Sequence, residues 1–322
     1  LQNRKQCVKI GEYVSQNLDV YSGVPQGSVL APLLFLIYIN DIHSCVSSSI
    51  QLRLFADDCV VYIAVKKSDD QILLNNSLES IHAWCVTWGM KLNADKTKSI
   101  TFTNKKHPLS FTYTLGDTQV KKYDQVKYLG LILTSNLRWE PYIKSICSKA
   151  VGKLHYLRRK LRNTPAHIKL SAYKTLIRPT LEYADIVWSP HQKSLINKLE
   201  RIQKLAVRFV YSKYSRETSA TSLIVQSNLQ SLSQRRIISR LKFLFQLLHG
   251  HFKIANSQYL HPPFKHSSRT NHSKTLRQPV SRVNIHKYSL FPDAITYWNK
   301  LPEDAVKCTS VELFLNYIEK ID

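Results

Sequence analysis

Two adjacent carboxylates, Asp57 and Asp58, are the residues of this chain best suited to do chemistry. Apolar runs at residues 52–56 and 60–63 flank them, and this pattern predicts a β-hairpin over residues 51–65 with both carboxylates in its turn. Because aspartate favours turns, a solvated loop tip is one interpretation. Both arms are apolar, however, so we expect the tip to lie at the edge of a buried sheet, where adjacent carboxylates need a cation. Carboxylate oxygens suit Mg²⁺, and two such ions suit phosphoryl transfer.

Strands and packed helices are expected around this pair. Residues 23–28, the sequence GVPQGS, predict a loop whose two glycines allow a close backbone approach. The helix expected at residues 30–39 is apolar nearly all round, which predicts burial. Another helix is expected over residues 68–88, with Trp88 in the core and Gly89 as its end. With strands expected at residues 99–103 and 126–134, the pattern indicates an α+β domain that ends near residue 137.

The rest of the chain has the apolar periodicity of helices. One stripe runs from residue 143 to residue 161, and a second helix is expected between Pro165 and Pro179. Two further helices are expected after Pro190 and around residues 237–248. Residues 261–287 predict a basic linker or a strap that faces nucleic acid, and a small helical module is expected to follow it.

The charge of the chain is concentrated in this second part. The net charge is +24. Residues 1–137 hold 14 Lys and Arg against 11 Asp and Glu, a net charge of +3, whereas residues 138–322 hold 32 against 11, a net charge of +21. Such an excess favours a polyanionic partner.

The apolar runs are too short to span a membrane, so no membrane partner is expected. The six cysteines form no CxxC pair, which argues against a zinc site and a disulfide framework. We therefore expect an intracellular protein, in the nucleus or the cytoplasm. The oligomeric state is left open.

Four motifs in order resemble those of reverse transcriptases, in particular of LINE-type and jockey-like non-LTR retrotransposons. Residues 23–42 are similar to the second palm motif, and Phe55-Ala56-Asp57-Asp58 is similar to the aromatic-x-Asp-Asp motif. Residues 88–97 resemble the next palm motif, and residues 128–130 resemble the primer grip. Two later stretches, residues 181–188 and 289–302, resemble segments found downstream of such polymerases.

The resemblance implies a role for each matching residue. Asp57 would bind metal directly, with Asp58 beside it as a weaker or second-sphere partner, and the complete enzyme would use two Mg²⁺ ions. Lys96 would meet the triphosphate, although an exposed lysine without a role is the alternative. The expected nucleotide and template contacts are Pro25, Gln26, Gly27 and Phe55, and the expected primer grip is Tyr128, Leu129 and Gly130.

The implied fold is an α+β palm subdomain of a right-hand polymerase, incomplete, followed by an all-α thumb-like bundle and a small helical C-terminal module. We expect the palm at residues 1–137, a basic helical thumb at 138–215, and the C-terminal region with its basic linker at 216–322. The thumb residues expected to bind nucleic acid are Lys153, Arg158, Arg159, Lys160 and Arg162.

The implied function is RNA-directed DNA synthesis, in which dNTPs are joined to the 3′ hydroxyl of a DNA primer on an RNA template. An RNA–DNA hybrid would then be a partner. The third metal-binding aspartate of the family is not found ahead of Gly23, so we expect the isolated chain to be inactive. The alternatives are a non-catalytic nucleic-acid-binding remnant and a group II intron-type maturase.

Overall fold

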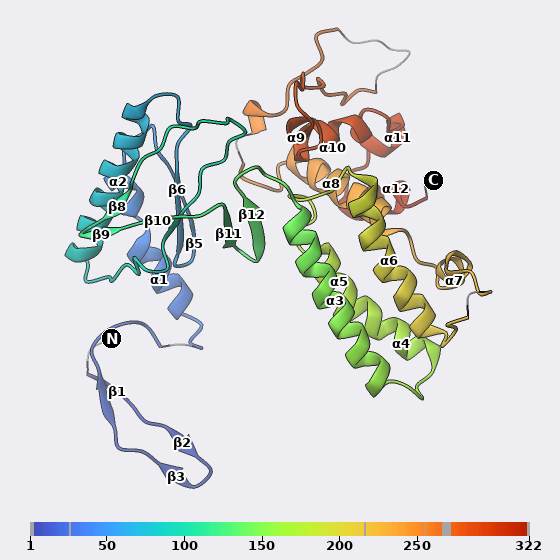
Figure 1. The fold of residues 1–322 in the computed structure, drawn as a ribbon, viewed down its shortest axis with the longest axis horizontal. Coiled ribbons are helices and arrows are strands. Elements are labelled where there is room, and N and C mark those ends of the chain that lie inside the picture. Colours follow the sequence, from blue (N-terminus) through green and yellow to red (C-terminus); the bar gives the residue numbers. More distant parts are fainter. Residues whose placement is uncertain (1–2, 26, 216, 255, 266–271, 321–322) are drawn as a thin grey trace. The chain divides into compact units, whose positions relative to one another are not determined.

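The computed structural model describes residues 3–25, 27–215, 217–254, 256–265 and 272–320. The chain divides into two compact units, residues 1–124 and 125–322 (Figure 1). The first unit mixes strands and helices, and the second is helical apart from one hairpin. The expected mixture of α and β structure is therefore confirmed. In the described part of the chain, no helix has the length and apolarity needed to cross a membrane.

The first unit consists of small two-stranded ladders around two helices. Three antiparallel strand pairs accompany the hairpin at residues 51–62: β1 (Arg4–Gln6) with β4 (Leu18–Val20), β2 (Lys9–Ile10) with β3 (Tyr13–Val14), and β8 (Thr114–Leu115) with β9 (Thr118–Gln119). One further pair is parallel and joins β7 (Lys98–Ser99) to β10 (Lys121–Lys122). The hairpin itself pairs β5 (Gln51–Phe55) with β6 (Asp58–Tyr62). The helices are α1 (Ala31–Ile39), the 3-10 helix Ile42–Cys45 and α2 (Ser68–Thr87).

Helix α1 contradicts the expectation of burial. Its buried residues are Ala31 and Ile39, whereas Leu33, Leu36 and Ile37 are 55%, 55% and 66% exposed. A helix that is apolar all round can turn only one side toward a core. Ile39 lies on that side and packs in the cluster of Ile42, Ile81, Trp84 and Cys85. The other sides of α1 have no covering element among the described residues of this unit.

Helix α2 is placed as expected, but its end differs in one residue. Gly89, at φ +68°, follows the helix, and the Met90 N–H donates to the Cys85 carbonyl (2.8 Å), as in a Schellman motif. Trp88 is then a cap residue and is 50% exposed, so its expected core position is wrong. Trp84, one turn earlier, occupies the core instead and is 9% exposed.

The second unit is a helical bundle followed by a helical module. It opens with the hairpin β11 (Gln125–Tyr128) and β12 (Leu131–Thr134), where we had expected one strand. The bundle contains α3 (Glu140–Lys160), α4 (Ala166–Ala172), the π-helix Tyr173–Ile177, α5 (Arg178–Glu182), α6 (Lys193–Val210) and α7 (Ala220–Gln226). The module contains α8 (Leu232–Leu248), a 3-10 turn (Asn256–Gln258), α9 (Asn284–Lys287), α10 (Leu290–Trp298), α11 (Glu303–Val306) and α12 (Val311–Ile318).

Pro179 does not end its helix, contrary to expectation. The chain passes through the π-helix Tyr173–Ile177 and continues as α5, with Pro179 in the first turn. A proline is tolerated in a first turn because its missing N–H has no intrahelical partner there, and a π-helical turn resets the register immediately before it. The helix therefore reaches Glu182.

Two separate cores stabilise the second unit. One joins the hairpin with α3 to α7, and its fully buried members include Ile143, Tyr173 and Trp188. The other joins α8 with α10 to α12 around Phe245 and Trp298. The apolar stripes predicted for α3 and α6 face the first core, so these predictions are confirmed.

Candidate active site and nucleic-acid interface

The carboxylate pair lies at the end of the hairpin β5–β6. Phe55 pairs with Asp58, which leaves Ala56 and Asp57 as the two-residue turn. Ala56 has φ +51°, the left-handed region that costs a residue with a Cβ atom about 1 kcal/mol or more. Such strain clusters at functional sites, where the surrounding structure enforces it. The turn thus holds Asp57 at the tip and Asp58 at the first position of β6.

Both carboxylates are exposed, and neither forms an ion pair within the described residues. The hairpin pairs with no further strand in that part of the chain, and Phe55 is 63% exposed. The expected edge of a buried sheet is therefore wrong: among the described residues the hairpin has no third strand, and the apolar residues Leu52, Leu54 and Val61 of its arms are only partly buried against the core cluster of this unit. The carboxylate oxygens of Asp57 and Asp58 are open to solvent and suited to a hard cation. Across the described residues, no group of three potential metal ligands occurs.

The loop before α1 has a conformation that requires glycine. Gly27 has φ +83°, and a Cβ atom built on it would meet nothing within 4 Å, so its backbone angle and not its surroundings demands glycine. The Pro25 carbonyl accepts a hydrogen bond from the Ser28 N–H (3.3 Å). Gln26 lies outside the described residues. The roles assigned to this loop stay predictions.

Lys96 is exposed and follows a turn organised by Asn93. The Asn93 side chain accepts from the Lys96 N–H (3.0 Å), and the Asn93 carbonyl accepts from the Thr97 hydroxyl (2.9 Å). Asn93 is therefore a turn residue, as a local structural role would require. No ion pair joins Lys96 to Asp57 or Asp58 among the described residues.

The expected primer grip is the turn of the β11–β12 hairpin. Tyr128 pairs with Leu131, and Leu129 and Gly130 form the turn with φ +43° and +82°, the signs of a type I′ turn. The Tyr183 hydroxyl donates to the Leu129 carbonyl (2.9 Å). A Cβ atom on Gly130 would lie 3.1 Å from the same tyrosine ring. Tyr183 thus fixes the turn, and a side chain at residue 130 would disturb it.

Comparison with known proteins identifies the first part of the chain. Residues 3–133 match the family model described as "Reverse transcriptase (RNA-dependent DNA polymerase)". This match contains the carboxylate hairpin, the glycine loop and the β11–β12 turn. The chain contains a reverse transcriptase domain at residues 3–133.

The similar curated proteins come from Drosophila melanogaster mobile elements. The chain is 25% identical over 290 residues to the "Probable RNA-directed DNA polymerase from transposon BS", which covers 87% of this chain and 32% of that protein. It is 27% identical to the corresponding protein of transposon X-element and 26% identical to that of mobile element jockey, each over 65% of this chain and 24% of the relative. The chain is therefore similar to jockey-like polymerases, and it spans a third or less of these relatives' length.

Exposed basic residues lie at the C-terminal end of α3. Four of the expected nucleic-acid contacts are exposed at its end: Arg158, Arg159, Lys160 and Arg162. The Arg158 guanidinium lies 4.4 Å from the centre of the Tyr214 ring. Lys153 differs from them, because its ammonium donates to the Leu176 carbonyl (3.0 Å) and the Thr180 hydroxyl (2.8 Å) and so ties α3 to the helix beside it.

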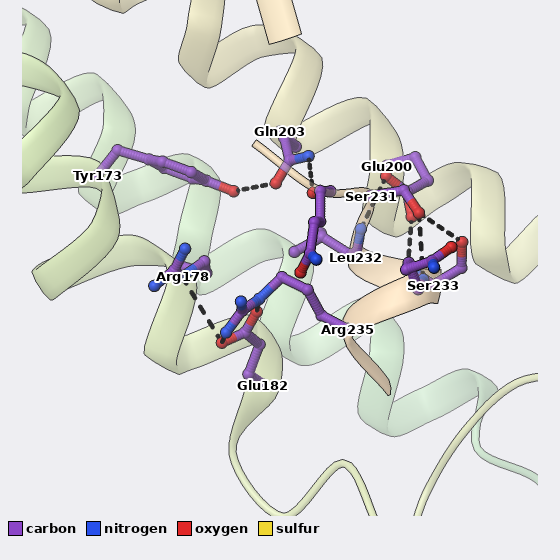
Figure 2. A network of polar contacts seen from close by, with 11 residues as sticks. Tyr173, Arg178, Glu182, Glu200, Gln203, Ser231, Leu232, Ser233 and Arg235 are labelled. Carbon is purple, nitrogen blue, oxygen red and sulfur yellow. Dashed lines mark hydrogen bonds and ion pairs between the residues drawn. The ribbon is translucent and has the colours of Figure 1, made fainter. Parts of the chain in front are cut away.

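A polar network, absent from our expectations, connects the helices of the second unit (Figure 2). Glu182 accepts from the Arg235 guanidinium and lies 3.6 Å from that of Arg178. Glu200 accepts from the backbone N–H groups that open α8, those of Leu232 (3.3 Å) and Ser233 (2.8 Å). The Tyr173 hydroxyl donates to the Gln203 side chain (2.7 Å) deep in the core. This network fixes α5 and α6 against α8.

Asp185 is the buried acid nearest this network. It is 6% exposed, it hydrogen-bonds with Ser239, and the guanidinium groups of Arg236 and Arg240 are near enough to lower its pKa. Burial outweighs these effects and raises the pKa of Asp185 to about 6. Although Tyr183-Ala184-Asp185 echoes the metal motif, Asp185 is enclosed within the fold.

This raised pKa predicts a specific dependence of stability on pH. Between about pH 4 and about pH 6, the folded state holds a proton on Asp185 that the unfolded state releases, so this residue makes stability fall as pH rises through that window. We expect Asp185→Asn to remove this slope. As pH rises through this window, the free energy of unfolding of the Asp185→Asn variant should increase relative to that of the parent by up to about 3 kcal/mol. Urea unfolding at several pH values measures the difference. Asp117→Asn, at an exposed turn, serves as the control, and parallel curves for parent and Asp185→Asn would contradict the assignment.

Proposed function

We propose that this chain is the metal-binding and nucleic-acid-binding part of an RNA-directed DNA polymerase. One observation carries the proposal. Asp57 and Asp58 are exposed at a strained hairpin turn, form no ion pair with any residue that the structure describes, and lie inside the segment that matches the reverse transcriptase family. Unpaired adjacent carboxylates repel each other unless a cation lies between or beside them. A jockey-like family and an open carboxylate pair support the same activity.

The two carboxylates fit Mg²⁺ in their chemistry, since hard oxygen ligands are what this ion prefers. Asp57, at the tip, would bind the ion directly, and Asp58 would support it. Because Mg²⁺ usually keeps several waters and phosphate oxygens as ligands, two protein carboxylates are a reasonable share of its shell. When bound, the ions neutralise charge on the reacting phosphate and favour the attack of a hydroxyl.

Other residues of the chain would then position the substrates. The Lys96 ammonium is exposed and would meet the triphosphate of the incoming dNTP. The turn at Leu129 and Gly130, held by Tyr183, would support the primer end near its 3′ hydroxyl. The loop at Gly27 would contact the template and nucleotide. In this proposal the first unit corresponds to part of a palm, and α3 to α6 correspond to a thumb.

Template-directed incorporation tests the proposed function. Because the chain spans a third or less of its relatives, the assay uses the full-length polypeptide that contains it. Labelled dNTPs are supplied with a DNA primer on an RNA template, with Mg²⁺. We expect incorporation only of the dNTP complementary to the template, and none after the ion is chelated. Binding of the primed template without any templated incorporation would refute the proposal.

A further inference from the structure

The C-terminal region contains a long stretch without negative charge. No Asp or Glu occurs from residue 218 to residue 292. Within this stretch, residues 261–287 hold six Lys and Arg. We call the described parts of this segment, residues 261–265 and 272–287, the basic strap. Its charge is uncompensated along its own length, so an anionic partner would meet no local repulsion.

Hydrogen bonds hold the strap against the end of α10. The Trp298 indole N–H donates to the Lys274 carbonyl (2.9 Å). The Asn299 side chain accepts from the Leu276 N–H (3.0 Å) and donates to the Leu276 carbonyl (2.7 Å), as a neighbouring strand would. Leu276 is 9% exposed and His272 is 6% exposed. The tail segment at residues 289–302 thus has a role, since it supplies the anchors that hold the strap extended.

The two arms of the strap meet at an exposed aromatic ring. The Arg277 N–H donates to the His261 carbonyl (2.8 Å), and its Nε donates to the Pro262 carbonyl (3.2 Å). Its guanidinium lies 3.6 Å from the centre of the Phe264 ring. Phe264 is nevertheless 83% exposed. Arg277 therefore covers one face of the ring and leaves the opposite face open to solvent.

Three other cations of the basic strap are unpaired among the described residues. Lys265, Arg282 and Lys287 are exposed, and none forms an ion pair with any residue that the structure describes. Phe264 thus presents an open aromatic face next to the charge of Arg277 and, one residue along the chain, that of Lys265. The combination is the one by which proteins bind unpaired nucleotides, with aromatic rings for the bases and cations for the phosphates.

We propose that the basic strap is a binding surface for single-stranded nucleic acid. A base would stack on the open face of Phe264, and Lys265, the next residue along the chain, would contact an adjoining phosphate. The open ring selects single strands, because base faces are already covered in a duplex. Because Trp298 and Asn299 already hold the strap backbone at Lys274 and Leu276, less conformational entropy is lost on binding. The strap belongs to the second unit and uses no residue of the carboxylate hairpin, so the proposal does not depend on the proposed polymerase activity.

Equilibrium binding to the full chain tests the strap. Fluorescence anisotropy is measured with labelled single-stranded RNA, single-stranded DNA and a duplex, each of about 12 nucleotides per strand, near the size of one such site. Phe264→Ala removes the ring, and Arg277→Gln removes the charge stacked on it. We expect Phe264→Ala to weaken single-strand binding about five- to tenfold, the loss of one stacked base, and to change duplex binding less than about twofold.

Matched controls separate stacking from general charge. Lys300→Gln removes one exposed charge from the same unit outside the strap and is expected to weaken all three ligands about equally and slightly. Because Phe264 is 83% exposed, its replacement leaves the fold intact, which thermal unfolding verifies. A loss on RNA or DNA single strands, or on both, supports the proposal and identifies the strand bound. Unchanged single-strand affinity in both strap variants overturns it, as does an equal loss on the duplex.

Discussion

Asp57→Asn in the full-length polypeptide is expected to lower RNA-templated primer extension by on the order of 10³-fold. The substitution preserves the size and shape of the side chain but removes its negative charge, and an amide oxygen is a far weaker ligand for Mg²⁺ than a carboxylate oxygen. Asp57 is exposed at the hairpin turn, so the fold should tolerate the change. The measurement is the rate of single-nucleotide addition on a primed RNA template at saturating dNTP.

Two further variants make this experiment selective. Asp117 is also an exposed aspartate in the turn of a β-hairpin, between β8 and β9. Asp117→Asn should leave the rate within about twofold of the parent, since it removes the same charge far along the chain from the motif. Asp58→Asn should lower the rate less than Asp57→Asn, because we propose that Asp58, the first residue of β6, is the weaker partner of the metal. Parent-like extension by Asp57→Asn, with unchanged template binding, would show that the hairpin does not hold the catalytic metal.

The sequence predicted those elements that follow from local patterns. The apolar stripe of α3 recurs at helical spacing over 21 residues, and Ile143, Ala150 and Leu154 of that stripe are buried as expected. The hairpin at residues 51–62 followed from two apolar runs around a turn, and Gly89 marked the end of α2. In each case the signal lies within a few residues of the structure that it specifies.

The errors concern burial, which depends on neighbours far away in the sequence. The apolarity of α1 is a local property, but Leu33 and Leu36 are exposed because the described residues of this unit offer no element to cover them. Trp84 and Trp88 are equally apolar, and only the position of the helix end decides which of them reaches the core. Pro179 was misjudged because a π-helix, for which the sequence has no known signal, precedes it.

Motifs in the sequence suggest the candidate site residues Asp57, Asp58 and Gly130, but they do not predict the contacts between distant segments. The contact of Tyr183 with the β11–β12 turn spans 54 residues, and no pattern connects the two segments. The same holds for Glu182 and Arg235, whose ion pair requires the packing of α5 against α8. A long-range pair of this kind is set by the fold, so it becomes visible only in the structure.

A second large effect is expected when salt is varied. The segment 138–322 holds 32 Lys and Arg against 11 Asp and Glu, a net charge of +21. Each phosphate contact releases counterions, so log K should fall with log salt by about 0.9 per contact on a duplex. Five contacts would weaken duplex binding several-hundred-fold for roughly a fourfold rise in salt. A salt titration of duplex binding by residues 1–322, followed by anisotropy, measures this slope.

The α3 cations are expected to carry a large share of that slope. Arg158, Arg159 and Lys160 are exposed in the last turn of the helix. Replacing all three by Gln should weaken duplex binding roughly tenfold or more at low salt and reduce the slope by about 2 to 3. Preference among template sequences should be unchanged, because phosphate contacts position a duplex without specifying its bases.

The control must remove three charges elsewhere on the same protein. Lys5, Lys9 and Lys105 are exposed lysines of the first unit, so replacing them by Gln lowers the net charge by the same amount. If binding depended only on overall charge, both triple variants would lose affinity and slope equally, and α3 would have no special role. A loss confined to the α3 variant places the phosphates along this helix. The Lys153 ammonium already donates hydrogen bonds to the Leu176 carbonyl and the Thr180 hydroxyl. Lys153→Gln should therefore lower the free energy of unfolding. It should leave the slope of log K against log salt within about half a unit of the parent value.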